Sequence, residues 1–195
     1  MTHMPSYGLH SFVDGKIMNR PYPEHEGDSD LISRVLETLK LVDTPPEEEF
    51  DKFTRLAKRM MDVPVALVSF VQEARDRQFF KSQVGLTGKW AELRQTPLSH
   101  SFCQHVQRQN RPLVVEAAPK HALVCDNLAI AELGVQAYLG VPVHGRRGMA
   151  LGALAVVDGV ERQWRKEDVE AMTDLAACVT DQIKLRDALT WASST

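Results

Sequence analysis

The sequence predicts an α+β fold, a central antiparallel sheet with long helices on one face and short helices and loops over the other. Residues 135–158 hold two apolar strands around a polar turn that contains glycine, which is the pattern of a β-hairpin. Residues 44–60 and 166–190 carry apolar side chains at helical spacing. The second strand of the hairpin, 150–157, is apolar at every position, so both of its faces must be covered by other parts of the chain.

The first strand of the hairpin alternates between two kinds of side chain, which predicts two different faces. Tyr138 and the small residues Gly140 and Gly152 are expected on the front face, where they would border a cavity. Such a cavity indicates a module that senses a small molecule. The helix-covered face would carry Ala137, Leu139, Val141 and Val143.

Length and composition limit the classes of function. A chain of 195 residues fits one domain with extensions. The net charge of −3 gives no electrostatic reason to expect nucleic acid or an anionic membrane as a partner, and no apolar run approaches the roughly 20 residues of a membrane span. Three cysteines without a secretory leader favour a reducing compartment, so we expect a cytoplasmic protein.

The domain is expected to span residues 29–190. Residues 1–28 contain scattered proline and glycine without periodicity and are predicted to form an irregular tail. Residues 191–195 are expected to fray at the C-terminus. Asp28 to Asp30 can cap a first helix that runs to about Val42.

The first and last helices both show the three-and-four spacing of a coiled-coil seam. We therefore expect a homodimer in which residues 30–42 and 166–188 of two chains pair in parallel. The expected seam residues are Ile32, Val35, Leu39 and Val42 in the first helix, and Val169, Met172, Ala176, Val179 and Ile183 in the last.

The middle of the chain supplies the remaining elements. Thr44 and Glu47 have the spacing of a capping box, which predicts a second helix with core residues Phe50, Phe53, Leu56, Ala57 and Met60. Two strands follow, over about 64–71 and 78–85, and then a connection over 85–100 that is long enough to cover a site. A short helix from about 101 to 110, a strand near 112–115 and a small helix over 127–133 lead into the hairpin.

Several segments resemble the GAF domain family over roughly residues 43–188. They are PVALVSFV, TPLSHSFCQHV, PLVVEAA, VQAYLGVPV and ALGALAVVD. The likeness is greatest to the GAF domains upstream of bacterial histidine kinases and diguanylate cyclases. It implies a regulatory domain in signal transduction, whose flanking helices pair two chains and report ligand state to an output domain or partner protein. The Asn-Lys-x-x-x-Phe-Asp-Glu motif of the cyclic-nucleotide-binding members has no counterpart here, which disfavours cyclic nucleotides.

We expect the ligand between the front of the hairpin and the segments 85–110 and 121–134, where apolar walls and a few polar groups would meet. The ligand and any cofactor stay unassigned. His100, His121 and His144 have no metal-ligand spacing, so no metal site is predicted. The expected lining residues are Phe79, Phe102, Cys103, His105, Asp126 and Tyr138.

The cysteines allow an alternative, because free methionine-(R)-sulfoxide reductases share the GAF fold and use cysteines in this region. The resemblance implies that a Cys125 thiolate would attack the sulfoxide sulfur, that Cys103 would resolve the sulfenic acid, and that Asp126 would bind the substrate ammonium or help proton transfer. Leu93 or a neighbour stands where those enzymes have a further cysteine. The same two thiols could instead form a redox switch. Cys125 also stands ten residues before Val135, as the chromophore cysteine of bilin-binding members does, but Asp126 replaces the histidine that follows it there.

Overall fold

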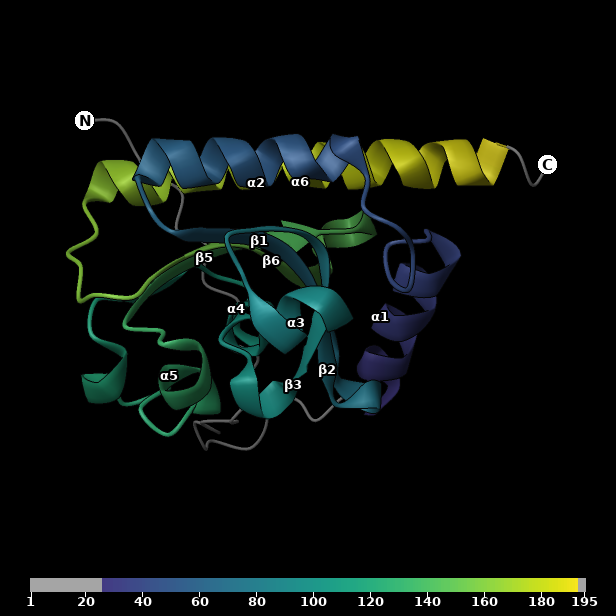
Figure 1. Cartoon of the computed structure of the whole chain (residues 1–195). Helices are drawn as coiled ribbons and strands as arrows, with labels where there is room; N and C mark the ends of the chain where they lie inside the picture. The colour runs from purple at the N-terminus through teal and green to yellow at the C-terminus, as the bar shows by residue number, and fades with distance from the viewer. Residues whose placement is uncertain (1–25, 193–195) are drawn as a thin grey trace, which may run out of the picture.

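The computed structural model describes residues 26–192, which form one six-stranded sheet (Figure 1). All neighbouring strands are antiparallel, in the order β3-β2-β1-β6-β5-β4. The strands are β1 (Val65–Gln72), β2 (Arg77–Val84), β3 (Gln95–Pro97), β4 (Leu113–Val115), β5 (Ala137–His144) and β6 (Ala150–Asp158).

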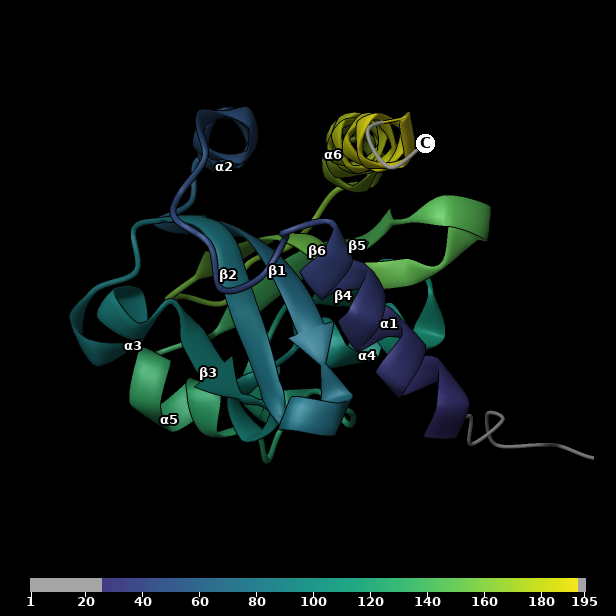
Figure 2. The ribbon, with the colours of Figure 1, turned by 90° about the vertical axis from the view of Figure 1, so that its right-hand side faces the viewer.

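The helices divide between the two faces of the sheet, as Figure 2 shows. The long helices α2 (Glu48–Met61) and α6 (Lys166–Ala192) cover one face, which we call the helix side. The short helices α3 (Gly88–Leu93), α4 (Cys103–Gln109) and α5 (Leu128–Leu133) lie over the other face, the front. Helix α1 (Glu26–Thr38) packs near the end of β1 and the turn Glu73–Arg75. The predicted fold class is confirmed.

Two hydrophobic clusters lie on opposite faces of the sheet, and the alternation of side chains along β5 assigns residues to each. Leu139 and its alternate neighbours pack in the helix-side core, together with side chains of α2 and α6. Tyr138 belongs to the front core. Other members of the front core are Leu67, Val71, Phe80, Phe102, Cys103, Val106, Val115, Val124, Ala153 and Ala155.

The predicted hairpin is confirmed, and its second strand is central in the sheet. β6 pairs with β1 on one side and with β5 on the other, which explains why nearly every residue of β6 is buried. Gly152 does not border a cavity, because a Cβ atom added there would lie 1.9 Å from the carbonyl oxygen of Ser69 in β1. This glycine instead permits the close approach of two backbones.

The segment before α2 differs from the prediction. α1 ends at Thr38, and Lys40 and Asp43 have left-handed backbone angles that turn the chain away from the helix before Val42. Asp28 to Asp30 lie inside α1 rather than capping it. Thr44 and Glu47 make no capping box: Nζ of the buried Lys81 donates to Thr44 Oγ1 at 2.6 Å and also bonds Glu47, which pairs with Arg186 as well.

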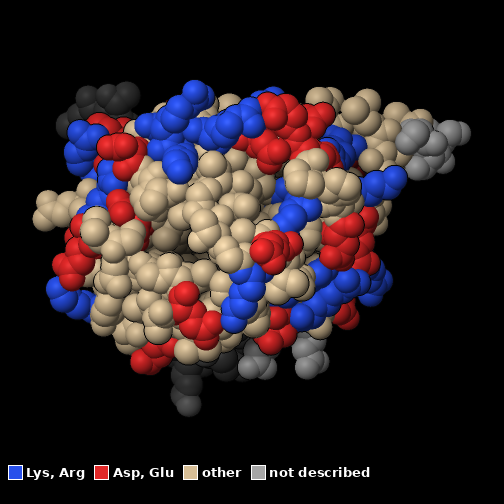
Figure 3. Space-filling view, viewed as in Figure 1, with Lys and Arg blue, Asp and Glu red and all other residues tan. Residues whose placement is uncertain are grey.

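Helix α2 is rotated relative to the predicted orientation. Phe50 and Ala57 are buried as expected, but Leu56 and Met60 are 39 and 45% exposed. The buried stripe follows steps of four, three and four along the helix, and its members are Phe50, Thr54, Ala57 and Met61. Lys and Arg gather near the C-terminal end of α2 and Asp and Glu near its N-terminal end, an arrangement that complements the helix dipole (Figure 3).

The predicted coiled-coil seams lie mostly inside the core of the chain itself. Met172, Ala176, Val179 and Ile183 of α6 are buried in the helix-side core, and Leu39 and Val42 join them from the segment after α1. Ile32, Val35 and Val169 pack against the same core in part. The three-and-four spacing serves a helix that packs on a sheet as well as one that packs on a second helix. The fully buried side chains among them are therefore not free to pair with another chain.

Two elements lie where only a connection was expected, since α3 and the three-residue strand β3 both fall within 85–100. Within residues 26–192, no helix is long and apolar enough to cross a membrane. The helix at the C-terminus continues to Ala192, two residues past the predicted end. Of the predicted tail of residues 1–28, residues 1–25 lie outside the described residues, and residues 26–28 belong to α1 instead of an irregular segment.

Candidate functional site

The front core holds a small group of polar atoms at the point where β5, β1 and α4 meet. The Tyr138 hydroxyl donates a hydrogen bond to Cys103 Sγ at 3.2 Å, and its ring packs against Phe102 with centroids 5.2 Å apart and planes at 53°. Phe102 and Cys103 sit at the start of α4, whose first turn is fixed by a bond from the Gln104 amide to Ser101 Oγ. The sequence predicted Phe102, Cys103 and Tyr138 at one site, and the structure brings these three together.

The ring of Tyr138 fills space on the front face of its own strand. A Cβ atom at Gly140 would lie 2.1 Å from the Tyr138 hydroxyl oxygen and 2.5 Å from Cζ. Gly140 is therefore required because the tyrosine ring lies across it. The region where the sequence predicted a cavity is occupied by this ring.

Ser69 adds a third polar group beside the thiol. It lies on β1 between Leu67 and Val71, which both belong to the front core, and it is fully buried. Its hydroxyl has no partner that meets hydrogen-bond geometry. A buried hydroxyl without a partner loses free energy relative to water, so Ser69 marks a position where a further polar group would be stabilising.

Burial decides the protonation of this group. Burial raises the pKa of the Cys103 thiol, and the contacts with Ser69 and Tyr138 oppose that effect only in part. Burial, and then the neighbouring Cys103, raise the pKa of Tyr138 well above its usual range. Both groups are protonated near neutral pH, so the tyrosine donates and the sulfur accepts. A protonated, buried thiol is a poor nucleophile.

Contacts between α3 and α5 close the rim of the front site. Trp90 of α3 packs on the buried ring of His100 with centroids 5.1 Å apart, and Nε2 of His100 lies 3.2 Å from the carboxylate of Glu132 in α5. Lys89 approaches the same carboxylate at 3.6 Å. The close contact with His100, and then the charge of Lys89, lower the pKa of Glu132. The segments 85–100 and 121–134 therefore meet over the front core, as the sequence predicted.

Phe79 lies on the wrong face for the predicted site. Its side chain packs in the helix-side core, where Cζ of the Arg94 guanidinium lies 5.0 Å from the centroid of its ring. The next residue, Phe80, belongs to the front core. The sequence could not choose between two adjacent phenylalanines, because the register of β2 depends on an irregularity in its pairing with β1 that follows Val68. Phe80 is the front residue that the prediction missed.

His105 and Asp126 do not share the buried position of Tyr138 and Cys103. His105 is half-buried on α4, and its pKa is lowered by burial and then by the charges of Arg108 and His121. In the turn before α5, Val124 packs into the front core, whereas Cys125 and Asp126 point outward and are exposed. The three cysteines are unpaired, and no cluster of side chains between residues 29 and 192 could hold a metal ion.

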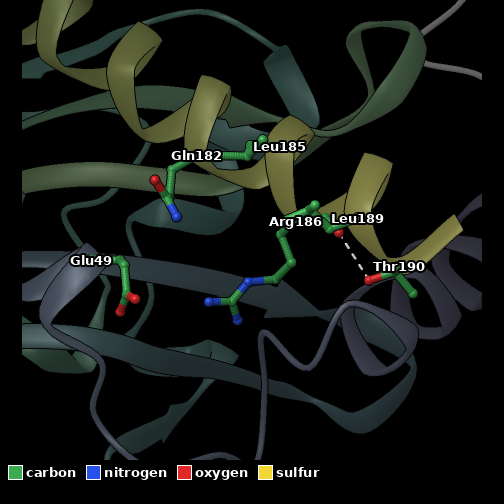
Figure 4. A pocket seen from close by; sticks show the side chains of 6 residues that line it. All are labelled: Glu49, Gln182, Leu185, Arg186, Leu189 and Thr190. Carbon is green, nitrogen blue, oxygen red and sulfur yellow. Dashed lines mark hydrogen bonds between the residues drawn. The ribbon is translucent and has the colours of Figure 1, made fainter. Parts of the chain in front are cut away.

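A hollow of about 340 Å³ lies on the opposite side of the molecule, between α2 and the C-terminal half of α6. Figure 4 shows Arg186 reaching across it toward Glu49. The lining combines charged, polar and leucine side chains without a buried polar atom that lacks a partner. Its residues are Glu49, Gln182, Leu185, Arg186, Leu189 and Thr190.

Residues 45–183 match the sequence model of the GAF domain. The chain belongs to the GAF domain family. No curated protein sequence matches it significantly.

Solved GAF structures share the fold at low sequence identity. The GAF domain of the Acinetobacter phosphoenolpyruvate-protein phosphotransferase is 20% identical, with a TM-score of 0.59 over 81% of this chain and 93% of the other. The free methionine-R-sulfoxide reductase of Neisseria meningitidis, solved with its substrate, is 16% identical, with a TM-score of 0.56 over 80 and 89%. The blue-light absorbing PixJ GAF domain of Thermosynechococcus elongatus is 14% identical, with a TM-score of 0.59 over 83 and 94%. At these identities, the likeness establishes the fold alone.

Proposed function

We propose that this GAF domain is a non-catalytic sensory domain in signal transduction, which binds a small molecule at the front site and passes its state to α6. One observation carries the proposal: the polar atoms of Tyr138, Cys103 and Ser69 converge inside an otherwise apolar core that short helices cover. Apolar walls with a few convergent polar groups are typical of small-molecule sites.

The state of the cysteines favours binding over catalysis. Cys103 is buried and its pKa is raised, whereas a resolving thiol must be reachable and readily ionised. Cys125 and Asp126 point away from the front core. Exposed, unpaired thiols at Cys125 and Cys178 are compatible with the reducing cytoplasm, which we propose as the location.

The strand that carries the site also contacts the helix that would carry the signal. Tyr138 faces the front, while alternate residues of β5 pack under α6. At the end of the strand, the amide of His144 donates to Thr180 Oγ1 at 3.1 Å, and Arg146 in the following turn pairs with Asp187. A ligand that binds one position of β5 more tightly than another would shift the equilibrium between the corresponding positions of α6. The free energy of this shift cannot exceed the ligand's differential affinity for the two positions.

We further propose that two chains associate through exposed residues of α6, since the predicted seam residues are buried. Leu185 and Leu189 are 55 and 63% exposed and lie one turn apart on α6, on either side of Arg186, which contacts Glu47. A parallel dimer through this surface would place the two C-terminal ends side by side, where an output domain or a partner protein could respond.

The experiment that tests the sensory proposal is a thermal-shift screen of small metabolites followed by hydrogen–deuterium exchange. A true ligand raises the midpoint of unfolding with concentration. It also slows amide exchange in α4, α5 and β5. Protection that maps to the hollow beside Arg186 would contradict the placement of the site.

A further inference from the structure

The side chain of Tyr138 occupies the front site, and its size and polarity indicate which kind of ligand the site accepts. The ring of Tyr138 lies over Gly140 and against Phe102, and its hydroxyl reaches Cys103. Beside the same thiol, the fully buried Ser69 hydroxyl contacts Cys103 but has no partner that meets hydrogen-bond geometry. The space thus accommodates one aromatic ring with one hydroxyl, and it holds one more hydrogen-bonding group than Tyr138 uses.

The charges around the site limit the ligand further. Among residues 29–192, the fully or nearly buried Lys and Asp side chains, Lys81 and Asp158, pair with Glu47 and Arg162. Both pairs lie on the helix side, since Lys81 lies over the Phe50 ring and Asp158 shares a face of β6 with Leu154 and Val156. At the rim, Lys89 and Glu132 already pair with each other, so an ionised ligand in the front core would be desolvated without a free counter-charge, which is strongly unfavourable. A neutral ligand avoids that cost.

We propose that Tyr138 occupies the ligand position of the front site and that the site takes an uncharged phenol-sized molecule, which displaces this side chain and bonds Cys103 and Ser69. The inference rests on the proposed function, because it names the ligand class of the same site. Displacement would couple binding to β5, since Tyr138 and the residues under α6 belong to one strand.

The test uses p-cresol, which matches the side chain of tyrosine, and toluene, which lacks the hydroxyl. We expect the Tyr138→Ala variant to bind p-cresol at least about tenfold more tightly than the wild-type protein, because the wild type must first move its own ring. We also expect the variant to prefer p-cresol to toluene by at least about fivefold, the value of one hydrogen bond. Titration calorimetry measures both ratios, and ligand-observed NMR measures the weak binding of the wild type.

Two matched variants separate this site from a cavity of any other origin. Leu139→Ala opens space on the helix side at the next residue of the same strand, where we expect no preference for p-cresol. In the Tyr138→Ala background, Ser69→Ala should reduce the preference for the hydroxyl. Thr96→Val removes another buried hydroxyl without a partner and should leave that preference unchanged.

Three results would overturn the inference: no binding of p-cresol to the wild type at millimolar concentration, equal affinity of folded Tyr138→Ala for the two probes, or an equal effect of Ser69→Ala and Thr96→Val. If Tyr138→Ala does not fold, Tyr138→Phe replaces it. This variant keeps the ring but loses the bond to Cys103, so it should bind p-cresol more tightly than the wild type. If exchange protection places a different ligand at the front site while p-cresol fails, the ligand class is wrong and the sensory function stands.

Discussion

Gly152 shows how a single missing side chain permits the sheet to form. Its Cα faces the backbone of β1 so closely that an added Cβ would lie 1.9 Å from the Ser69 oxygen and 2.8 Å from the Phe70 Cα. Backbone atoms in the middle of a sheet cannot retreat as a flexible side chain can. The position therefore helps to fix the relation of Ser69 to the rest of the front site.

We predict that Gly152→Ala destabilises the protein by about 2 kcal/mol or more, in the range of an overpacked core. Urea denaturation followed by circular dichroism measures the change. Gly159→Ala is the matched control, because the nearest atom to a Cβ there lies 3.8 Å away. It should change stability by less than about 0.5 kcal/mol. Equal effects of the two substitutions would refute the steric argument.

The two partners of the Glu47–Lys81 ion pair differ in burial and in their other contacts. We therefore predict that removing the charge of Glu47 destabilises the protein more than removing the charge of Lys81. Lys81 is completely buried, and Glu47 also binds Arg186. Glu47→Gln leaves a buried ammonium without its counter-charge and should cost about 3 kcal/mol or more. Lys81→Met leaves Glu47 paired with Arg186 and should cost less. Chemical denaturation at neutral pH measures both variants, and the reverse order would contradict this account.

The same carboxylate predicts a dependence on pH. Burial favours a higher pKa for Glu47, but the hydrogen bonds and charges of Arg186 and Lys81 outweigh it, so the folded-state pKa lies below the ordinary value of 4.5. The stabilisation is present above pH 4.5 and is lost as pH falls toward the folded-state pKa. We expect Glu47→Gln to lose less stability than the wild type between pH 6 and pH 3. A parallel loss in both proteins would assign acid unfolding to other carboxyl groups.

At the scale of elements, the sequence predicted what hydrophobic periodicity controls. The hairpin, α6 and the strands β1 and β2 follow from alternating or helical patterns. The patterns did not specify which helix face meets the sheet, so Leu56 and Met60 are exposed where burial was expected. They also could not reveal β3, because its three residues form a strand only through pairing with β2.

Some residues of the candidate site could be predicted from the sequence and others could not, for similar reasons. Alternation along β5 correctly placed Tyr138 on the front, and the expectation that the segment 85–110 covers the front placed Phe102 and Cys103 there. Phe79 was misplaced because local pairing decides the face of β2. Ser69 was missed because a serine within an apolar strand gives no signal of what faces it.

Asn127 caps helix α5 and also connects this helix to Ser101, just before α4. The side chain of Asn127 accepts a bond from the Ala129 amide at 3.0 Å and donates to the Ser101 oxygen at 3.2 Å. We predict that Asn127→Ala lowers stability by about 1 kcal/mol, the usual value of an N-cap. Amide exchange in Leu128–Leu133 should accelerate while exchange in α6 stays unchanged. Asn127→Asp keeps the cap but loses the bond to Ser101, so an intermediate effect is expected, and no effect of either variant would remove the role in capping.

At the scale of the whole molecule, the sheet separates the front, where we propose that the ligand binds, from the helix side, which would carry the signal. β5 belongs to both faces, since Tyr138 points to one and Leu139 to the other. Two adjacent residues of α6, Arg186 and Asp187, pair with Glu47 and Arg146 on different elements. Leu185 and Leu189, beside these ion pairs, are 55 and 63% exposed, so this part of α6 presents apolar surface that a second chain could cover.

We predict that the protein is a dimer through this part of α6 and that the double variant Leu185→Glu, Leu189→Glu is a monomer. Burying a leucine contributes about 1.5–3 kcal/mol, so charges at both positions should weaken dimerisation at least about 100-fold. Sedimentation equilibrium measures the association. Because both side chains are more than half exposed, the midpoint of unfolding of the monomer should change little beyond the loss of association.

Val160→Glu is the matched control, since Val160 is 63% exposed like Leu189 but lies after β6, before α6 begins. It should leave the dimer intact. Val179→Glu should instead unfold the domain, because that side chain is fully buried in the helix-side core. The dimer proposal would be refuted by a wild-type protein that stays monomeric at high concentration, or by a control that dissociates as readily as the double variant. The exposed part of α6 would then contact a different protein or no protein. The regulatory signal would then have to leave the domain through the position of α6 within one chain.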